Sequence, residues 1–218
     1  MRSPGTALLR VDKDVRGEAI MDTVGSPQRV GNCDVDEFTT LSRDVLASAL
    51  GVDWPPGPTA QPVRDDNLVR SLRTHIDLVL SMYGDQLEAL AERFDDGSSS
   101  PVTAEWAEGT AHRLAAAVFE DDVTNWGRVL TLVAFAKVLG RRLAARGAPR
   151  SAWAMLDGVV RYLARSKRSW ILDHGGWAGC AQSPIGRDES PSLNRVLLTL
   201  AGVGAAFALF AGRHLQFF

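Results

Sequence analysis

The stretch DDVTNWGRVLTLVAF, which begins at Asp121, places a permanent cation at the start of a helix that has to be buried. The residues that follow Arg128 are so uniformly apolar that they predict a helix inside the protein. Asn125 or Thr124 can cap the start of this helix. Asp121 and Asp122, just before it, favour the positive end of the helix dipole. An arginine at that end gains nothing from the dipole, so we expect Arg128 either to reach solvent or to pair with a carboxylate.

Length and composition indicate one globular domain with flanking segments. The chain has 218 residues, 45% of them hydrophobic and 23% charged, and a formal net charge of -2. That charge, with no long basic stretch, argues against general nucleic-acid binding. Cys33 and Cys180 form neither a disulfide framework nor a metal-ligand set, so we expect a reducing compartment. The N-terminus lacks the apolar core of a secretory signal, so export by that route is not expected.

Apolar residues recur at intervals of three and four along most of the chain, which predicts an all-α fold. The predicted organisation is a flexible arm (1–34), a helical domain (35–182), a polar linker (183–192) and an apolar tail (193–213). Within the domain the pattern predicts helices over 35–50, 67–94, 101–119, 126–145 and 152–173. The second of these is either one helix or two helices broken near Gly84. The proline-rich stretch 51–62 is predicted to be a loop, and Gly175 with Gly176 is predicted to end the last helix.

The predicted buried faces of these helices include Leu41 in the first, together with Phe38, Val45, Ala49 and Leu50. In the second helix the recurring apolar residues are Leu68, Leu72, Ile76, Val79, Leu80, Tyr83, Leu87, Leu90 and Phe94. Each set lies on one side of a helix, as expected for amphipathic helices around a core.

The tail contains 17 residues without a charge, VLLTLAGVGAAFALFAG, at 196–212. This is the lower end of the length that crosses a bilayer as a helix, about 17–25 residues. Arg195 and Arg213 flank the run and can reach the membrane surface from either end. We therefore predict a C-terminal membrane anchor, with a buried helix of the domain as the alternative. Because a polar linker precedes the tail, we expect removal of 193–218 to cost the domain few core contacts.

No residue pattern predicts an enzyme. The histidines occur singly and lack a carboxylate or cysteine at ligand spacing, and no phosphate loop or nucleophile motif is present. His174 precedes two glycines and is expected to be a solvated residue at a helix end. We accordingly expect no catalytic residue, no metal and no cofactor.

Two motifs resemble those of the Bcl-2 family of apoptosis regulators. VFEDDVTNWGRVLTLVAF (118–135) is similar to the family's first homology motif, and WILDHGGWAGC (170–180) is similar to its second. The second motif is carried by Trp170, Gly175, Gly176 and Trp177. Each motif alone is moderately specific for the family, whereas the two motifs in this order, together with the apolar tail, are a strong signal for it. VTNWGRVLTLVAF, RSKRSW and NRVLLTLAGVG are most similar to the myeloid-cell-leukaemia-type, pro-survival branch.

The resemblance implies a bundle in which amphipathic helices wrap a central apolar hairpin, followed by a C-terminal transmembrane helix. It also implies a groove that receives the amphipathic death-motif helix of a pro-apoptotic partner. Arg128 would pair with the aspartate of that helix through its planar fork. Asn125 would hydrogen-bond near this aspartate, and Gly127 would allow close approach. The other groove positions implied by the resemblance are Ala115, Val118, Thr131, Leu132, Phe135 and Tyr83.

The sequence departs from the family pattern in three places. Asp122 stands where glycine is usual, and we expect it to pre-pair Arg128 and narrow the choice of ligand. Ala178 and Cys180 replace an acid and an aromatic residue in the second motif, which predicts poorer capping and packing there. The chain's own third motif fits two registers, and the first is formed by Leu80, Gly84 and Asp85. The second register starts from Leu68 and is formed by Tyr83, Leu87 and Leu90.

The resemblance implies an anti-apoptotic protein that heterodimerises with pro-apoptotic family members. The implied location is the cytosolic face of the mitochondrial outer membrane and also the endoplasmic reticulum membrane. A tail folded into the domain's own groove, until a ligand displaces it, would make the protein partly cytosolic. The alternatives are a pore-forming effector of the same fold and, in another class, a helical membrane scaffold without a groove.

Overall fold

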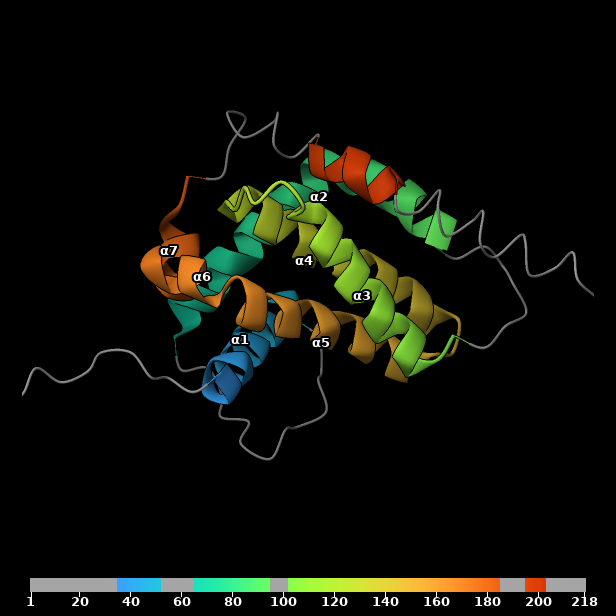
Figure 1. Ribbon diagram of the computed structural model, residues 1–218, viewed down its shortest axis with the longest axis horizontal. Helices are drawn as coiled ribbons and strands as arrows, with labels where there is room; N and C mark the ends of the chain where they lie inside the picture. The colour runs from blue at the N-terminus through green and yellow to red at the C-terminus, as the bar shows by residue number, and fades with distance from the viewer. Residues whose placement is uncertain (1–34, 52–64, 95–101, 185–194, 203–218) are drawn as a thin grey trace, which may run out of the picture. The chain divides into compact units, whose positions relative to one another are not determined.

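The computed structural model of the protein describes residues 35–51, 65–94, 102–184 and 195–202 (Figure 1). The helices are α1 (Val35–Leu50), α2 (Asp66–Phe94), α3 (Ala104–Val118), α4 (Trp126–Ala145), α5 (Pro149–Ser166), α6 (Arg168–Asp173) and α7 (Gly176–Gln182). Residues 195–202 form a further helical segment. No strand occurs in these four stretches, which agrees with the predicted all-α fold. The predicted arm, and all of the predicted loop at 51–62 except Gly51, lie outside the described residues.

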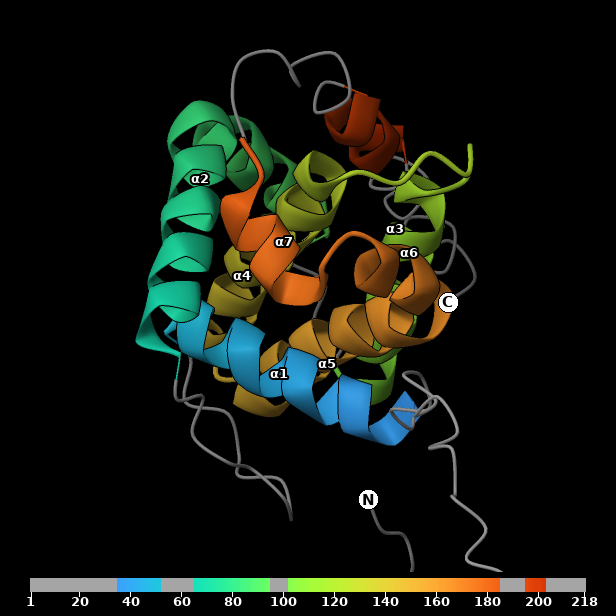
Figure 2. The same cartoon turned by 90° about the vertical axis from the view of Figure 1, so that its left-hand side faces the viewer.

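α4 is the central helix, because fifteen of its twenty residues are buried. It forms a hairpin with α5, and α2 packs on α4 while α3 packs on α5. α6 and α7 lie close to the start of α4 and to α1 (Figures 1 and 2). This arrangement confirms the predicted central hairpin wrapped by amphipathic helices.

α1 and α2 follow the predicted periodicity with one exception. α2 is a single helix through Gly84, so the predicted alternative of two helices is wrong. Leu41 was expected on the buried face of α1, yet its side chain is 50% exposed. Ser42 is buried instead, because its hydroxyl accepts a hydrogen bond from Nε1 of Trp177 at 3.0 Å. A polar residue inside the buried stripe shifted the face away from the one that the apolar residues alone predicted.

α3 begins at Ala104, later than the predicted start at Pro101. Thr103 is the cap, since its side chain accepts a hydrogen bond from the backbone N–H of Trp106 at 3.2 Å. A threonine in this position satisfies one of the free N–H groups of the first turn and fixes where the helix starts.

The predicted helix at 152–173 is two helices. α5 starts at Pro149, in the first turn where proline is tolerated, and the chain breaks at Lys167 before α6. The helix before Gly175 ends at Asp173, as predicted, but a further helix, α7, follows the two glycines. The φ of Gly175, 82°, is in the left-handed region that favours glycine, and this residue turns the chain between α6 and α7.

Residues 195–202 pack on the domain. Val196 and Leu200 are buried in the same core as the preceding helices, while Leu198 is exposed. The expectation that the tail shares few core contacts with the domain is therefore wrong, since these side chains lie one helical turn apart on a buried face. The rest of the predicted anchor, 203–213, lies outside the described residues. Among the residues that are described, no helix has the length and apolarity needed to cross a membrane.

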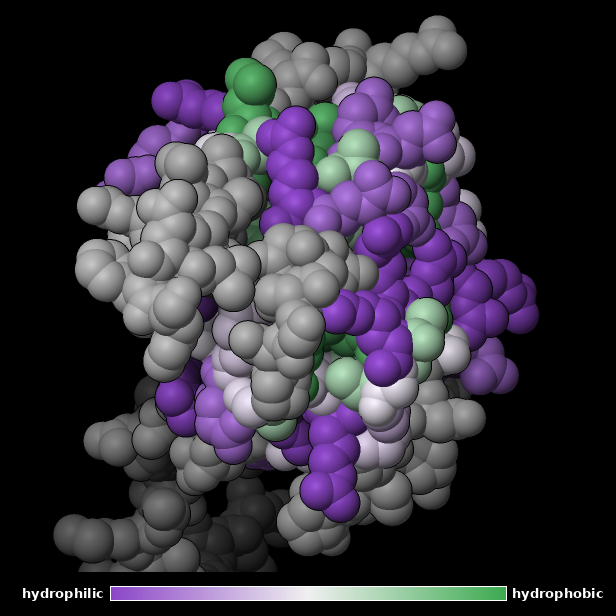
Figure 3. All heavy atoms as spheres, turned by 90° about the vertical axis from the view of Figure 1, so that its right-hand side faces the viewer, coloured by the Kyte–Doolittle hydropathy of each residue, from purple (hydrophilic) through white to green (hydrophobic). Residues whose placement is uncertain are grey.

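Hydrophilic side chains dominate the described surface on the face shown in Figure 3, where hydrophobic atoms are visible only in small groups. Ion pairs link α2 to α4: Glu88 pairs with Arg141, and Arg142 lies 3.5 Å from Glu88 and from Glu92. Such exposed pairs contribute little to stability. The core, rather than these charges, holds α2 on α4.

Gly158 sits where α5 and α3 approach closely. A Cβ at this position would lie 2.7 Å from Cβ of Ala111 and 3.3 Å from the carbonyl oxygen of Glu108. We expect Gly158→Ala to lower the free energy of unfolding by about 1–3 kcal/mol, because α3 has to move away. Denaturant unfolding measures this change.

Gly84→Ala is the matched control, since a Cβ at Gly84 would meet nothing within 4 Å. This substitution should raise the free energy of unfolding by roughly 0.5–1 kcal/mol through helix propensity. Equal effects of the two substitutions would contradict the close contact between α3 and α5.

Candidate functional site

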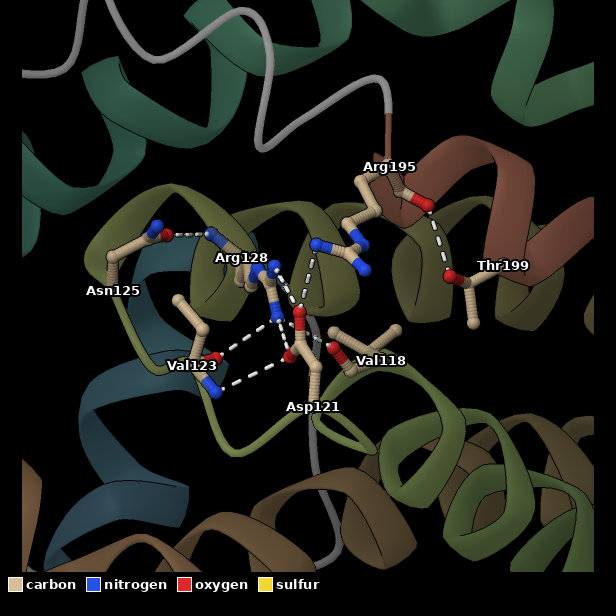
Figure 4. A network of polar contacts seen from close by, with 7 residues as sticks. All are labelled: Val118, Asp121, Val123, Asn125, Arg128, Arg195 and Thr199. Carbon is tan, nitrogen blue, oxygen red and sulfur yellow. Dashed lines mark hydrogen bonds and ion pairs between the residues drawn. The ribbon is translucent and has the colours of Figure 1, made fainter.

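The start of α4 is fixed by its capping residue. Asn125 has an extended backbone, with φ -149° and ψ 165°, and its side chain accepts a hydrogen bond from the backbone N–H of Arg128 at 2.8 Å. Of the two predicted caps, Asn125 is therefore the one used. The cap places Arg128 in the first turn of the helix, with its side chain beside the loop that precedes α4 (Figure 4).

Arg128 is buried, with only 3% of its side chain exposed, and it has found a carboxylate within its own chain. Nη1 and Nη2 bind the two oxygens of Asp121, with Nη2 2.9 Å from Oδ2 (Figure 4). Nη1 also donates to the carbonyl oxygens of Val118, at 3.2 Å, and Val123, at 3.0 Å. The resemblance implied a carboxylate from a partner, whereas this structure supplies it from Asp121. Nε of Arg128 is buried and has no hydrogen-bond partner among the described residues.

Asp121 is held ionised by these contacts. Hydrogen bonds from Arg128 keep the pKa of Asp121 well below its ordinary value of 3.8, and partial desolvation opposes them only in part. The backbone N–H of Val123, 3.2 Å away, and the charges of Arg128 and Arg195 lower the pKa further. The site therefore contains a carboxylate that stays charged at any pH near neutrality.

Asp122 does not pair with Arg128, so the prediction named the wrong one of two adjacent acids. Its φ of 57° is in the left-handed region, where a residue with a side chain is rare. This backbone turn directs Asp121 toward Arg128, while the charge of Asp122 contributes, after burial, to the raised pKa of Tyr162. The positive φ also explains physically why glycine suits this position in the family pattern.

A second arginine, Arg195, also contacts Asp121. Nη1 of Arg195 lies 3.3 Å from Oδ2 of Asp121, and 67% of the Arg195 side chain is exposed (Figure 4). Arg195 starts the helical segment 195–202, in which the hydroxyl of Thr199 donates to the carbonyl oxygen of Arg195 at 2.9 Å. From the sequence, Arg195 was expected only at the edge of a membrane. Nothing in the sequence pattern linked it to a residue 74 positions earlier (195 - 121).

The positions predicted to line a groove are brought together, but in the core. Gly127 on α4 is buried. Five further predicted groove residues are each 3% exposed or less: Ala115, Val118, Thr131, Leu132 and Phe135. Tyr83 on α2 is half-buried and packs against the same core, to which Val196 and Leu200 also belong. A partner helix would have to displace side chains of the chain itself to reach these positions.

The tryptophans of the second motif pack α6 and α7 against the start of α4. Trp126 lies in an edge-on contact with Trp170, at 4.9 Å between ring centroids, and 6.2 Å from Trp177. Trp177 is buried and donates to Ser42 of α1. Trp126 thus packs against both tryptophans of the second motif. Cys180 is also fully buried, and α7 begins without a side-chain cap, which agrees with the expected poorer capping.

Both registers of the third motif lie on α2. Leu80 and Gly84 are half-buried and Asp85 is exposed. In the other register Leu68 is half-buried, and Leu87 is buried in the core. The first register thus combines half-buried positions with an exposed acid, whereas the second combines half-buried and buried positions, and both stay predictions.

The comparisons with known proteins agree with this geometry. Residues 72–177 match the sequence profile described as apoptosis regulator proteins, Bcl-2 family. The anti-apoptotic protein NR13 of Coturnix japonica is 31% identical over 110 residues, which are 48% of this chain and 62% of that protein. The apoptosis regulator BAX of Homo sapiens is 33% identical over 91 residues, 42% of this chain and 45% of that protein. The matches thus span less than two thirds of these relatives.

Solved structures share the fold at low sequence identity. The zebra-fish pro-survival protein NRZ, in complex with Bad BH3, has a TM-score of 0.50 at 19% identity, over 68% of this chain and 92% of that chain. Chicken BOK has a TM-score of 0.53 at 17% identity, over 68% and 98% of the two chains. The likeness to the myeloid-cell-leukaemia-type branch stays a prediction. The profile match shows that residues 72–177 carry a Bcl-2 family domain, and the solved structures share its fold.

Proposed function

We propose that this chain regulates apoptosis, without enzymatic activity, by binding the death-motif helix of pro-apoptotic Bcl-2 family proteins beside Arg128. The observation that carries the proposal is the guanidinium of Arg128, which binds a carboxylate at two points at the start of the central helix. An aspartate on a partner helix can occupy the place that Asp121 holds here. Arginine, with its planar fork, suits this two-point contact better than lysine.

We further propose a protective rather than a killing role. The supporting similarities are to NR13, which is described as anti-apoptotic, and to the pro-survival protein NRZ, whose structure contains Bad BH3. Trichoplax adhaerens trBcl-2L2, bound to trBak BH3, has a TM-score of 0.50 at 20% identity. These partners belong to the relatives and suggest which peptides to test.

Binding at this site is an exchange. A partner's aspartate can take both terminal nitrogens of Arg128 only if Asp121 releases them, so the affinity reflects the difference between two ion pairs. The apolar side of the partner helix would meet positions that are now buried, such as Val118 and Phe135. The displaced side chains of the segment 195–202 would return to solvent or enter another apolar environment.

For location, we propose the cytosolic face of the mitochondrial outer membrane, with the tail 193–213 as the anchor. Val196 and Leu200 are buried in the domain here. Anchoring through the whole tail requires their release, so part of the protein is expected in the cytosol, and the endoplasmic reticulum membrane is a second location. This proposal rests on the apolar run at 196–212 and its flanking cations.

A pore-forming effector is the second candidate function, because BAX is 33% identical over 91 residues. A helical scaffold without a ligand groove is the candidate from another class. Binding of death-motif peptides separates the scaffold from the other two, and cell survival separates the regulator from the effector.

The first prediction concerns peptide binding. We expect Bad BH3 and trBak BH3 peptides to bind the full chain, and Arg128→Ala to weaken binding roughly 10- to 100-fold, the size of a hydrogen-bonded contact to a charged group. Isothermal titration measures both affinities, and circular dichroism checks that the helical content is unchanged.

Arg141→Ala is the matched control, because Arg141 is on the same helix and 65% exposed. It should leave the affinity unchanged. A panel of death-motif peptides that all fail to bind the wild-type chain would rule out both groove-based functions.

The second prediction concerns pH. Because Arg128 lowers the pKa of Asp121 in the folded state, the pair stabilises the fold above the ordinary aspartate pKa of 3.8 and loses this effect as the pH falls further. We expect the melting temperature of Asp121→Asn to lie below that of the wild type by a constant amount between pH 6 and 8. The gap should narrow below about pH 4. A gap that stays constant down to pH 2 would contradict a charged pair.

The third prediction separates protection from killing. Cells that express the chain should survive a death stimulus better than cells with an empty vector, and Arg128→Ala should lose this protection because it no longer captures death-motif helices. Cell viability is the measurement. Death without any stimulus would instead support the effector function.

A further inference from the structure

Asp121 has two different neighbours, and they differ in exposure. Its carboxylate binds the buried guanidinium of Arg128 through both oxygens, and Oδ2 also lies 3.3 Å from the exposed guanidinium of Arg195. About a quarter of the Asp121 side chain, 26%, is exposed. This carboxylate therefore contacts one buried cation and one exposed cation, both through Oδ2 (Figure 4).

Once a partner's aspartate is bound and Arg195 is displaced, the charges at the site balance only when another cation is present. Arg128 and Asp121 together are neutral, so an arriving aspartate makes the trio negative, with two carboxylates competing for one guanidinium. Like charges at this separation repel, and burial strengthens the repulsion. A positive side chain on the arriving helix, placed on Asp121, restores neutrality.

The segment 195–202 shows what kind of helix fits. It presents Arg195 to Asp121 while Val196 and Leu200, one and five residues later, enter the core. The helical segment that now contacts Asp121 thus carries a cation next to apolar residues at helical spacing. We expect a partner helix that replaces this segment to carry the same two features, a cation and an adjacent apolar face.

We propose that Asp121 is a specificity-determining residue, which selects partner helices that carry a lysine or arginine beside their apolar stripe in addition to their aspartate. Asp121 releases Arg128 to the partner's aspartate and accepts the partner's cation in the place of Arg195. This inference rests on the proposed function, because it concerns the same site and the same class of partner.

Peptide titration tests the proposal on the full chain. In the Bad BH3 and trBak BH3 peptides, each polar position carries in turn arginine or its neutral isostere citrulline. At one position, we expect arginine to bind the wild type about three- to tenfold more tightly than citrulline, the size of one partly exposed ion pair. With Asp121→Asn this preference should disappear.

Asp122→Asn is the matched control, since Asp122 adjoins Asp121 but does not pair with Arg128, and asparagine tolerates its positive φ. This variant should keep the preference for arginine. Its loss in both variants, or its persistence in Asp121→Asn, would overturn the proposal. If wild type binds the peptides with no arginine preference at any position, the inference is overturned and the proposed function stands. If no peptide binds at all, both are overturned.

Arg195→Gln gives a second readout that does not depend on the stability of Asp121→Asn. Arg195 is mostly exposed, so the substitution should leave the fold intact. The substitution should raise the affinity for the arginine peptide about two- to threefold more than the affinity for the citrulline peptide, because it removes the cation that competes for Asp121. Equal effects on the two peptides would overturn the proposed replacement of Arg195.

Discussion

The ion pair of Arg128 with Asp121 makes it possible for the central helix to begin with a cation inside the protein. A buried charge without a partner is very costly, and further hydrogen bonds to the terminal nitrogens of a buried arginine reduce the cost of burying its ion pair. Here the loop before α4 closes around the guanidinium, with the carbonyl oxygens of Val118 and Val123 at hydrogen-bond distance. The loop, the cap at Asn125 and the first turn of α4 thus depend on one another.

Much of the fold was predictable because it follows from the period of apolar residues. The bounds of α1, α2 and α4 were correct to within one residue, since these helices bury continuous apolar faces. The start of α3, the break between α5 and α6, and α7 were missed. Each of them is decided by one local feature, such as the hydroxyl of Thr103 or the left-handed turn at Gly175, and such features carry no period.

The residues of the site were predictable as a set, whereas their pairing was not. The sequence places two acids just before Arg128, and only the backbone turn at Asp122 decides that Asp121 faces the guanidinium. The contact with Arg195 joins the loop before α4 to the segment 195–202 and depends on the tertiary fold. Periodicity and motif spacing describe neighbours along the chain and therefore could not reveal it.

The same logic applies to the tail, because apolar composition alone does not distinguish burial in a protein from burial in lipid. Within 195–202 one side is buried, through Val196 and Leu200, and another is open, with Leu198 73% exposed. An apolar residue on the open side gains nothing from this docking, so the segment is seated with part of its hydrophobic surface unburied. For such a helix, transfer to a second apolar environment would bury the apolar surface that is still exposed, which favours the transfer. The contact between Arg195 and Asp121 holds the start of this segment on the domain, so its loss would favour release of the segment.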